Sequence, residues 1–255
     1  MLRRIYNNEL LQSYFLGQKS YLIASFPKVG STFTRFVLAN IFKLQKNAET
    51  EIDFFTLGKI MPELGKSSFW MDWDNTLSPK WIKTHSEFSR QFKKANGILY
   101  IVRDPRDTML SYHAYAKAKK ALQAPLELKA FIKDEQMGIA ALNRHIEGYW
   151  SNKSYLFKYE DLMTNPKSCF NGFLNEHLNL GIDEQIISRA VDASLPDKLR
   201  KVEEKAGRPT DVNYKSDFKF VRNASIEQWK TQMDVELANQ ILDLSHPFFK
   251  EVNYF

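Results

Sequence analysis

Short apolar runs recur along the chain, and three of them are followed by a helical pattern. These three are rich in β-branched and aromatic residues, and they span Tyr21–Phe26, Gly97–Val102 and Ser154–Tyr159. A shorter fourth run spans Lys80–Lys83. Buried parallel strands have this length and this near-continuous apolar character, because helices cover both faces of their sheet. The pattern predicts an α/β fold with a central parallel β-sheet flanked by helices.

The segments after the first two runs have the periodicity of helices. From Ser31 onward, apolar residues recur every 3.6 residues on one helix face, at Phe33, Phe36, Val37, Ile41 and Leu44. After the second run, Asp104 is suited to cap a helix whose first residue is Pro105, because aspartate and proline favour these two positions.

A further helix is predicted near the C-terminus. Residues 225–228 have the spacing of a capping box, in which Ser225 and Gln228 cap each other's backbone. The helix that they open carries apolar residues on one side, at Ile226, Trp229, Met233, Leu237 and Ile241.

The stretch from Ile52 to Pro79 shows no clean period. It contains several aromatic residues with two prolines and two glycines, and we expect irregular structure that covers the ligand edge of the sheet. Ligands of open α/β sheets bind beyond the carboxyl ends of the strands, so this position matters. Because the chain has no repeat, low-complexity tract or Pro/Gly/Ser linker, we expect a single domain over residues 1–255.

The composition narrows the class of protein. Of the 255 residues, 44% are hydrophobic and 14% aromatic, which excludes a disordered chain. The one cysteine, Cys169, excludes an intramolecular disulfide and a Cys-based zinc site. The apolar runs are far shorter than the roughly 20 residues of a membrane helix, and the N-terminus lacks the apolar part of a signal peptide. We therefore expect a soluble cytoplasmic protein, whose net charge of +6 is compatible with an anionic ligand.

The segment after the first strand is suited to bind an anion. Its small residues lead directly into a helix, so several backbone N–H groups converge near the positive end of the helix dipole. Ser31 and Thr32 add hydroxyl groups, Lys28 adds a positive charge, and Gly30 supplies the bend. Because Lys28 precedes the glycine, this P-loop-like segment is not a Walker A loop. The alternative is a tight strand-to-helix turn without a ligand.

The second strand ends in a basic segment. Arg103 lies at the carboxyl end of this strand, where a guanidinium can bind a phosphate through two hydrogen bonds. Ser111 lies two turns into the following helix, on a face that can look back toward the first turn. A structural ion pair is the alternative for Arg103, and we expect Arg106 to pair with Asp107 or another acidic neighbour.

Four motifs, taken in order, resemble those of one family. Pro27–Phe33 reads Pro-Lys-Val-Gly-Ser-Thr-Phe, which is similar to Pro-Lys-Ser-Gly-Thr-Thr-Trp in the sulfotransferases that use 3′-phosphoadenosine 5′-phosphosulfate (PAPS). The other three are Lys83-Thr-His85, Arg103 with Ser111 and Tyr112 after it, and Tyr159-Glu-Asp161. The resemblance is to the cytosolic-type branch. The family's C-terminal Arg-Lys-Gly is only partly kept, because Asn223 and Ala224 follow Arg222.

The resemblance implies a nucleotide site made by residues from all of these segments. Lys28, Gly30, Ser31 and Thr32 correspond to residues that hold the 5′-phosphosulfate. Arg103, Ser111 and Arg222, with the loop residues Asn223 and Ala224, correspond to the site of the 3′-phosphate. Phe33, Leu195 and Tyr159 correspond to residues beside the adenine and nucleotide. The donor is then PAPS, and the product is 3′-phosphoadenosine 5′-phosphate (PAP).

The resemblance also implies a reaction, which is sulfuryl transfer to a hydroxyl group by in-line displacement. His85 is the expected general base, since a histidine with an ordinary pKa of about 6.5 is mostly neutral at neutral pH. Lys28 and Lys83 would stabilise negative charge on the reacting oxygens. We expect no metal, because lysines and backbone amides meet this charge.

The acceptor is expected to be a small alcohol or phenol. The aromatic residues of the irregular stretch, together with a histidine near the second strand, are candidates for its pocket; they are Phe54, Phe55, Trp70, Trp73 and His113. Core packing explains these aromatic residues equally well. The dimerisation motif of many animal members is only half matched after Lys230, so the sequence leaves the oligomeric state open.

Two other functions compete with this interpretation. A kinase-like phosphotransferase could use the same anion-binding turn with ATP, but the sequence has no Walker-type Lys-Ser/Thr order and no evident magnesium-binding carboxylate. A basic nucleic-acid-binding module would need exposed aromatic residues among clustered cations, whereas the aromatic residues here are typical of a core. We therefore expect neither a nucleic acid nor a membrane as partner.

Overall fold

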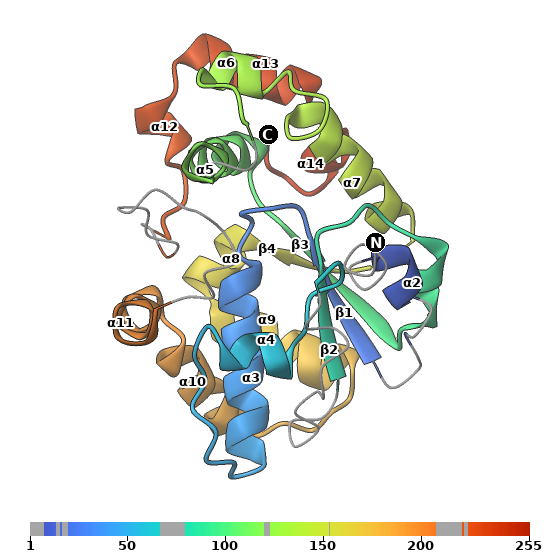
Figure 1. The fold of residues 1–255 in the computed structure, drawn as a ribbon, viewed down its shortest axis with the longest axis vertical. Helices are drawn as coiled ribbons and strands as arrows, with labels where there is room; N and C mark the ends of the chain where they lie inside the picture. The colour runs from blue at the N-terminus through green and yellow to red at the C-terminus, as the bar shows by residue number, and fades with distance from the viewer. Residues whose placement is uncertain are drawn as a thin grey trace.

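A parallel sheet of four strands lies at the centre of the computed structural model (Figure 1). The strands are β1 (Ser20–Ser25), β2 (Lys80–Thr84), β3 (Gly97–Val102) and β4 (Tyr155–Lys158), in the spatial order β2-β1-β3-β4. The register pairs Ile23 of β1 with Lys83 on one side and with Leu99 on the other. All four predicted strands are confirmed, with ends that differ by at most one residue.

The structure describes residues 8–13, 16, 20–66, 80–119, 123–152, 154–207, 221 and 224–255. Before β3 the helices are α2 (Glu9–Ser13), α3 (Ser31–Gln45), α4 (Thr56–Ile60) and the 3₁₀ helix η2 (Arg90–Lys94). Between β3 and the turn after β4 they are α5 (Pro105–Ala118), α6 (Leu128–Phe131), α7 (Ile139–Ser151), α8 (Tyr159–Thr164), α9 (Pro166–Asn171) and the π-helical turn η4 (Gly172–His177). The rest are α10 (Glu184–Ala193), α11 (Pro196–Ala206), α12 (Trp229–Gln232), α13 (Val235–Leu244) and α14 (Phe248–Glu251).

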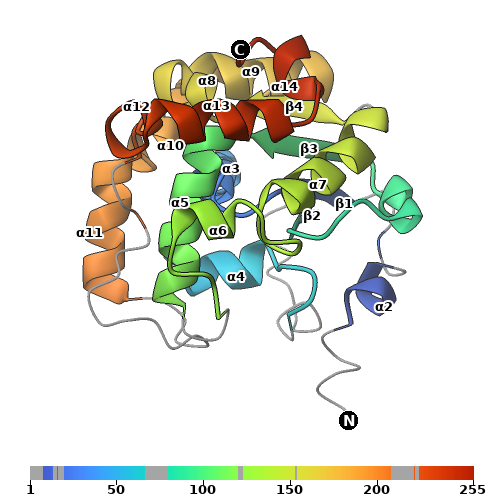
Figure 2. The same cartoon turned by 90° about the horizontal axis from the view of Figure 1, so that it is seen from above.

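Helices cover both faces of the sheet. One group consists of α3, α4, α9, α10 and α11, and the other of α5, α6, α7, α13 and α14 (Figures 1 and 2). The strands are buried on both sides as a result, which explains their continuous apolar sequences. Across the described residues, the structure has no helix with the length and apolar character needed to cross a membrane.

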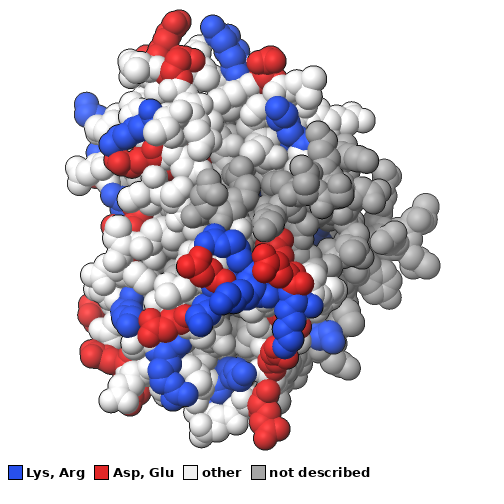
Figure 3. Space-filling view, turned by 90° about the vertical axis from the view of Figure 1, so that its left-hand side faces the viewer, with Lys and Arg blue, Asp and Glu red and all other residues white. Residues whose placement is uncertain are grey.

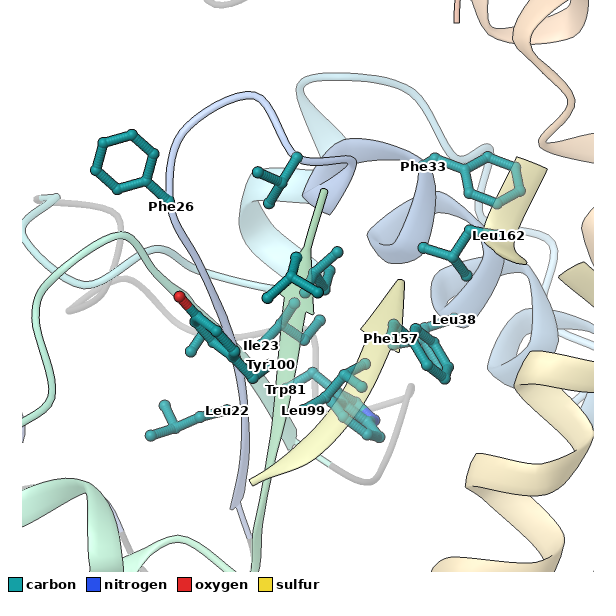
Figure 4. Close-up of a cluster of buried hydrophobic side chains, with 14 of the residues drawn as sticks. Leu22, Ile23, Phe26, Phe33, Leu38, Trp81, Leu99, Tyr100, Phe157 and Leu162 are labelled. Atoms are coloured by element: carbon teal, nitrogen blue, oxygen red, sulfur yellow. The ribbon is translucent and has the colours of Figure 1, made fainter. Parts of the chain in front are cut away.

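The core is rich in aromatic side chains from the strands and the helices that flank them. Trp81 of β2 stacks on Tyr21 of β1, with 4.8 Å between ring centroids, and its other neighbours include Phe42 of α3. Phe157 of β4 packs edge-on against Phe170 of α9. Figure 4 shows Trp81 and Phe157 among the other buried apolar side chains of the strands, such as Leu99 and Tyr100. This packing fixes the strand ends that carry the predicted site residues.

The helices after β1 and β3 begin as the sequence predicts. The side chain of Asp104 accepts a hydrogen bond of 2.8 Å from the backbone N–H of Arg106, and Pro105 is the first residue of α5. In α3, Phe33, Phe36 and the other predicted apolar positions are buried or pack against the core. Both starts therefore place a helix N-terminus at the carboxyl edge of the sheet.

The prediction of one C-terminal helix from Ser225 is wrong, since two helices form there. The backbone becomes extended at Met233, and Asp234 caps α13 by accepting a 2.7 Å hydrogen bond from the N–H of Leu237. Ile226 is among the exposed apolar residues. The stronger cap at Asp234 begins a new helix, and the carbonyl of Ser225 serves Arg103 instead.

The irregular structure expected after Ile52 is interrupted by a short helix. Within the described part of this stretch, Asp53 accepts hydrogen bonds from the N–H groups of Phe55 and Thr56, and α4 follows. Beyond α4, Glu63 forms an isolated parallel bridge with Lys83 of β2. Residues 67–79 lie outside the described residues.

Figure 3 shows one face of the molecule, the side on which α11 lies, with charges of both signs side by side. The sequence of α11 explains the mixture, because its cations are interleaved with carboxylates. They are Lys198, Arg200, Lys201 and Lys205 among Asp197, Glu203 and Glu204.

Candidate active site

The turn between β1 and α3 has the strand-turn-helix arrangement that the sequence predicts. Gly30 has φ 106°, in the left-handed region, and precedes Ser31, the first residue of α3. A Cβ atom on Gly30 would lie 2.7 Å from Cδ2 of Tyr159, so the turn and this ring approach too closely for a larger residue. The first N–H groups of a helix lack intrahelical partners, and the helix dipole favours negative charge there. The turn can therefore cradle an anion.

Lys28 lies in the same turn and extends toward α5. Its Nζ atom is 5.1 Å from the centroid of the Tyr115 ring, within the range of a cation–π contact. The Nζ atom of Lys119 lies 5.8 Å from the same centroid. Two ammonium groups thus gather on one aromatic ring beside the anion-binding turn.

Arg103 is buried at the carboxyl end of β3. Its guanidinium lies over the Tyr159 ring at 4.3 Å from the centroid, donates to the carbonyl of Ser225 at 2.9 Å and pairs with Asp107 at 3.2 Å. The Nε atom of Arg103 is buried without a hydrogen-bond partner among the described residues. Buried donors are normally paired, so this guanidinium has capacity for a further acceptor. Arg106 pairs with Asp104 at 2.6 Å, as expected of an acidic neighbour, whereas Asp107 serves Arg103.

The other predicted nucleotide residues lie in different environments, and two of them fall outside the described residues. Ser111 is buried in α5, and Phe33 packs edge-on against Phe170 near the end of α9. Leu195 is exposed at the start of α11, and Ala224 has φ 50°. Thr32 is half-buried in the first turn of α3. Arg222 and Asn223 lie outside the described residues.

Lys83 forms a buried ion pair at the end of β2. Its Nζ atom lies 2.8 Å from Oε2 of Glu63, and the two side chains are 10% and 25% exposed. Burial lowers the pKa of Lys83, and the Glu63 carboxylate opposes this shift. Arg35 of α3 lies near the pair and donates hydrogen bonds to the carbonyls of Leu57 and Met61. The site therefore holds several positive charges close together.

His85 follows β2 and has a defined orientation. Its Nδ1 atom lies 2.7 Å from the carbonyl oxygen of Ser25, at the end of β1. A carbonyl oxygen can only accept, so Nδ1 carries the proton and Nε2 of the neutral ring keeps a lone pair. Burial, and after it the charge of Lys83, lowers the pKa of His85 to about 3, while Glu63 and the Ser25 carbonyl act in the opposite direction. The imidazole is consequently neutral at neutral pH.

The candidate acceptor residues are spread over several environments. Phe54 packs edge-on against Phe36 of α3, with 5.0 Å between centroids, and Phe55 is exposed. The Nε2 atom of His113 lies 3.0 Å from the carbonyl of Pro125, and its ring is 5.0 Å from that of Phe131. His113 is thus engaged with the segment around α6. Trp70 and Trp73 lie outside the described residues.

Two residues beside His85 are not placed there by any motif in the sequence. Glu63 belongs to a stretch without periodicity, and the only signal for it was that a buried lysine needs a carboxylate partner. His145 of α7, which the sequence favours as structural or surface, is buried, with Nδ1 2.8 Å from the Tyr100 hydroxyl. Burial, and then the charge of His85, lowers the pKa of His145 to about 3.

This edge of the sheet therefore combines an anion-binding turn, buried cations and a neutral imidazole. Such a set can bind a multiply charged anion, and it can accept a proton from a group beside His85. Among the described residues, no group of three or more His, Cys, Asp and Glu side chains is arranged to hold a metal ion.

Comparisons with known proteins agree with this geometry. The sequence matches the family model of the sulfotransferase domain over residues 18–252. Sulfotransferase 1A1 of Mus musculus is 24% identical over 250 residues, covering 89% of this chain and 83% of that protein. A crystal structure of a mouse sulfotransferase complexed with PAP superposes with a TM-score of 0.69 and 16% identity, covering 97% of this chain and 90% of that one. The crystal structure of retinol dehydratase in a complex with retinol and PAP superposes with a TM-score of 0.69 and 14% sequence identity. The match covers 96% of this chain and 86% of that one.

The matched region begins before β1 and ends after α14. It includes the anion-binding turn, the ends of β2 and β3, and the turn after β4, which carry the four motifs. The match over nearly the whole chain shows that this protein belongs to the family of PAPS-dependent sulfotransferases.

Proposed function

We propose that the protein transfers the sulfuryl group of PAPS to a hydroxyl group of a small organic acceptor, with His85 as the general base. One observation carries this proposal: four parallel strands end at one edge of the sheet, and each end bears one of the four motifs. Lys28, His85, Arg103 and Tyr159 thereby come from segments far apart in sequence to a common edge. Ligands of open parallel sheets bind at this edge.

The residues of the edge fit a doubly phosphorylated nucleotide. The unpartnered Nε atom of Arg103 and the close approach of Gly30 to Tyr159 support an anion at each of two positions. The phosphosulfate would be held by Lys28, Gly30, Ser31 and Thr32. The 3′-phosphate would be held by Arg103, Ser111 and Arg222 with the loop at Asn223 and Ala224, and the base by Phe33, Tyr159 and Leu195.

When bound, PAPS supplies an activated sulfuryl group. His85 would take the proton of the acceptor hydroxyl at Nε2 while the acceptor oxygen forms its bond to sulfur. The bond between sulfur and the 5′-phosphate oxygen of PAPS would break in the same step, and PAP would leave with that electron pair. Lys28 and Lys83 stabilise the negative charge that develops on oxygen. A pKa of about 3 makes His85 a weak base in the free protein, and negative charge brought near the ring raises that pKa.

The acceptor is an alcohol or phenol with an apolar or ring-containing body. Phe54 and Phe55 lie in the segment that leads through α4 to Glu63, and Phe54 packs against Phe36 of α3. Retinol, which is named as bound in one of the structural neighbours, is an alcohol of this apolar kind.

Nucleotide binding tests the donor. In calorimetric titrations we expect PAP to bind far more tightly than ADP with magnesium, because Arg103 and the cradle match two separate phosphate positions. A preference for ADP with magnesium would contradict the sulfotransferase proposal and favour a phosphotransferase. Transfer from radiolabelled PAPS, screened across phenols, alkanols, sugars and amines, then identifies the acceptor class.

The variant His85→Ala tests the base. We expect turnover to fall about 10²- to 10⁴-fold, the usual contribution of a general base, with PAP affinity unchanged. His177→Ala, which removes an exposed histidine of η4, is the matched control and should retain turnover. Full turnover in His85→Ala would remove this residue from the mechanism.

A further inference from the structure

Glu63 is held beside the proposed catalytic residues by the backbone as well as by its side chain. The N–H of Lys83 donates to the carbonyl of Pro62, and the N–H of Leu64 donates to the carbonyl of Lys83, both at 2.9 Å. These two bonds form the parallel bridge between Glu63 and Lys83. The carboxylate therefore lies next to the Lys83 ammonium at 2.8 Å because of the fold, and not by a chance contact of two flexible side chains.

The surroundings of His85 and Glu63 are mostly positive. The charged and titratable groups that act on His85 come from four segments; they are Lys83 of β2, Arg35 of α3, His145 of α7 and Glu63 itself. The Glu63 carboxylate also acts on Lys119, after α5, whose pKa it raises against the larger effect of burial. In the part of the chain that the structure describes, Glu63 is the carboxylate that faces both Lys83 and His85.

We propose that Glu63 is a positioning residue of the transfer reaction. It fixes the Lys83 ammonium at the end of β2, and it supplies the negative charge that balances His85 when this ring takes up the acceptor's proton. The inference rests on the proposed function, since it assigns a role within the same reaction.

The charge balance explains why such a residue is needed. Proton transfer to His85 places a further positive charge beside Lys83 and Arg35, and an uncompensated buried charge is strongly unfavourable. Although burial raises it, the pKa of Glu63 is held well below its usual value by Lys83, His85 and Arg35. Glu63 therefore stays ionised throughout the reaction and can stabilise the imidazolium ion.

The variant Glu63→Gln keeps the shape of the side chain and removes its charge. We expect kcat to fall about 10- to 100-fold, because the protonated form of His85 loses its counter-ion. We also expect the acid limb of the kcat–pH profile to move to lower pH, because the pKa of His85 falls without the carboxylate. A purely structural role would leave the position of this limb unchanged. PAP affinity should stay within a few-fold of the wild type.

Two further variants complete the comparison. Glu63→Asp retains the charge, and we expect the acid limb to return toward its wild-type position. Glu87→Gln is the matched control, since Glu87 follows His85 closely in sequence but forms an exposed ion pair with Arg144; it should match the wild type in kcat and pH profile. An unchanged acid limb and kcat in Glu63→Gln would overturn the inference.

The test remains decisive if Glu63→Gln fails to fold. Glu63→Gln can be combined with Lys83→Gln, which removes both buried charges, and compared with Lys83→Gln alone in single-turnover experiments. The double variant should again have its acid limb at lower pH, and coincident profiles would contradict the inference. Failure of the proposed function is distinguished by the wild type itself, which would then neither bind PAP nor transfer sulfuryl groups.

Discussion

At the scale of single residues, carboxylates at the carboxyl edge of the sheet offset the unfavourable burial of positively charged side chains. Three of the buried cations among the described residues each lie against a carboxylate, which offsets their burial, while Arg35 donates to backbone carbonyls instead. The pairs are Lys83–Glu63, Arg103–Asp107 and Arg106–Asp104, with N–O distances of 2.8, 3.2 and 2.6 Å. The carboxylates thus allow cations to be held in place before an anionic ligand arrives.

Gly30 is the residue whose replacement tests the anion-binding turn most directly. In Gly30→Ala the new Cβ would meet the Tyr159 ring at 2.7 Å, at a φ of 106° that alanine rarely adopts. We expect loss of PAP binding and a decrease of at least about 1 kcal/mol in the free energy of unfolding. Calorimetric titration with PAP and urea denaturation measure the two effects.

Gly58→Ala is the control for this substitution. A Cβ on Gly58, within α4, would meet no atom within 4 Å. Alanine favours a helix over glycine by up to about 1 kcal/mol, so this variant should bind PAP normally and be as stable as the wild type or more so. Wild-type PAP binding by Gly30→Ala would show that the nucleotide does not use this turn.

The basic residues of the site could be predicted from the sequence, whereas the carboxylate that pairs with Lys83 could not. Lys28, His85 and Arg103 could be found because each follows a strand within a recognisable motif. Glu63 could not, since it lies in a stretch without periodicity and meets Lys83 only through pairing between distant segments. A carboxylate partner is required by electrostatics, but which one supplies it depends on the tertiary structure.

At the scale of elements, the starts of helices decide the local structure. Asp104 and Asp183 cap α5 and α10 by accepting a hydrogen bond from the N–H of the second residue of each helix. Asp234 caps α13 by accepting from the N–H of its third residue, Leu237, and this cap ends the continuous helix that the apolar period of the sequence favours. Periodicity alone could not reveal the break, because both short helices keep apolar residues at compatible positions.

The variant Asp234→Ala tests the cap of α13. Loss of the hydrogen bond to the Leu237 N–H should lower the free energy of unfolding by about 1 kcal/mol, as is usual for such a cap. Asp243→Ala removes an exposed aspartate from the last turn of the same helix, where a negative charge opposes the helix dipole, and it should cost nothing. Urea denaturation of both variants gives the comparison, and equal stabilities would refute the capping role.

At the scale of the whole molecule, the strand order determines which motifs become neighbours. The sequence indicated four parallel strands, but their order β2-β1-β3-β4 depends on how the connections pack. This order places the end of β1 between those of β2 and β3. Ser25 of β1 can therefore orient His85 after β2, while the turn after β1 reaches Tyr159 beyond β4.

Buried histidines make the stability of the fold sensitive to acid. The pKa of His145 is about 3 in the folded protein and about 6.5 when unfolded. The unfolded chain therefore binds more protons between these values, and stability decreases as the pH falls through this range. From pH 7 to pH 5 this residue accounts for a loss of about 2 kcal/mol in the free energy of unfolding.

The variant His145→Asn should show a smaller loss than the wild type over the same pH interval. Urea denaturation at both pH values measures the difference, which does not depend on the overall stability of the variant. His177→Asn, at an exposed position, should leave the wild-type loss unchanged. If His145→Asn and the wild type lost equal stability, His145 would not be the buried neutral group described above.

The position of Trp229 has a practical consequence. Its backbone N–H donates to Asp107, the carboxylate that also holds Arg103, and its ring lies 3.7 Å from the guanidinium carbon of Arg106. We expect a rearrangement of Arg103 toward a phosphate to change the surroundings of this indole through Asp107. The intrinsic fluorescence of Trp229 should therefore report nucleotide binding. The difference between the emission of the wild type and that of Trp229→Phe isolates this signal from the emission of the other tryptophans.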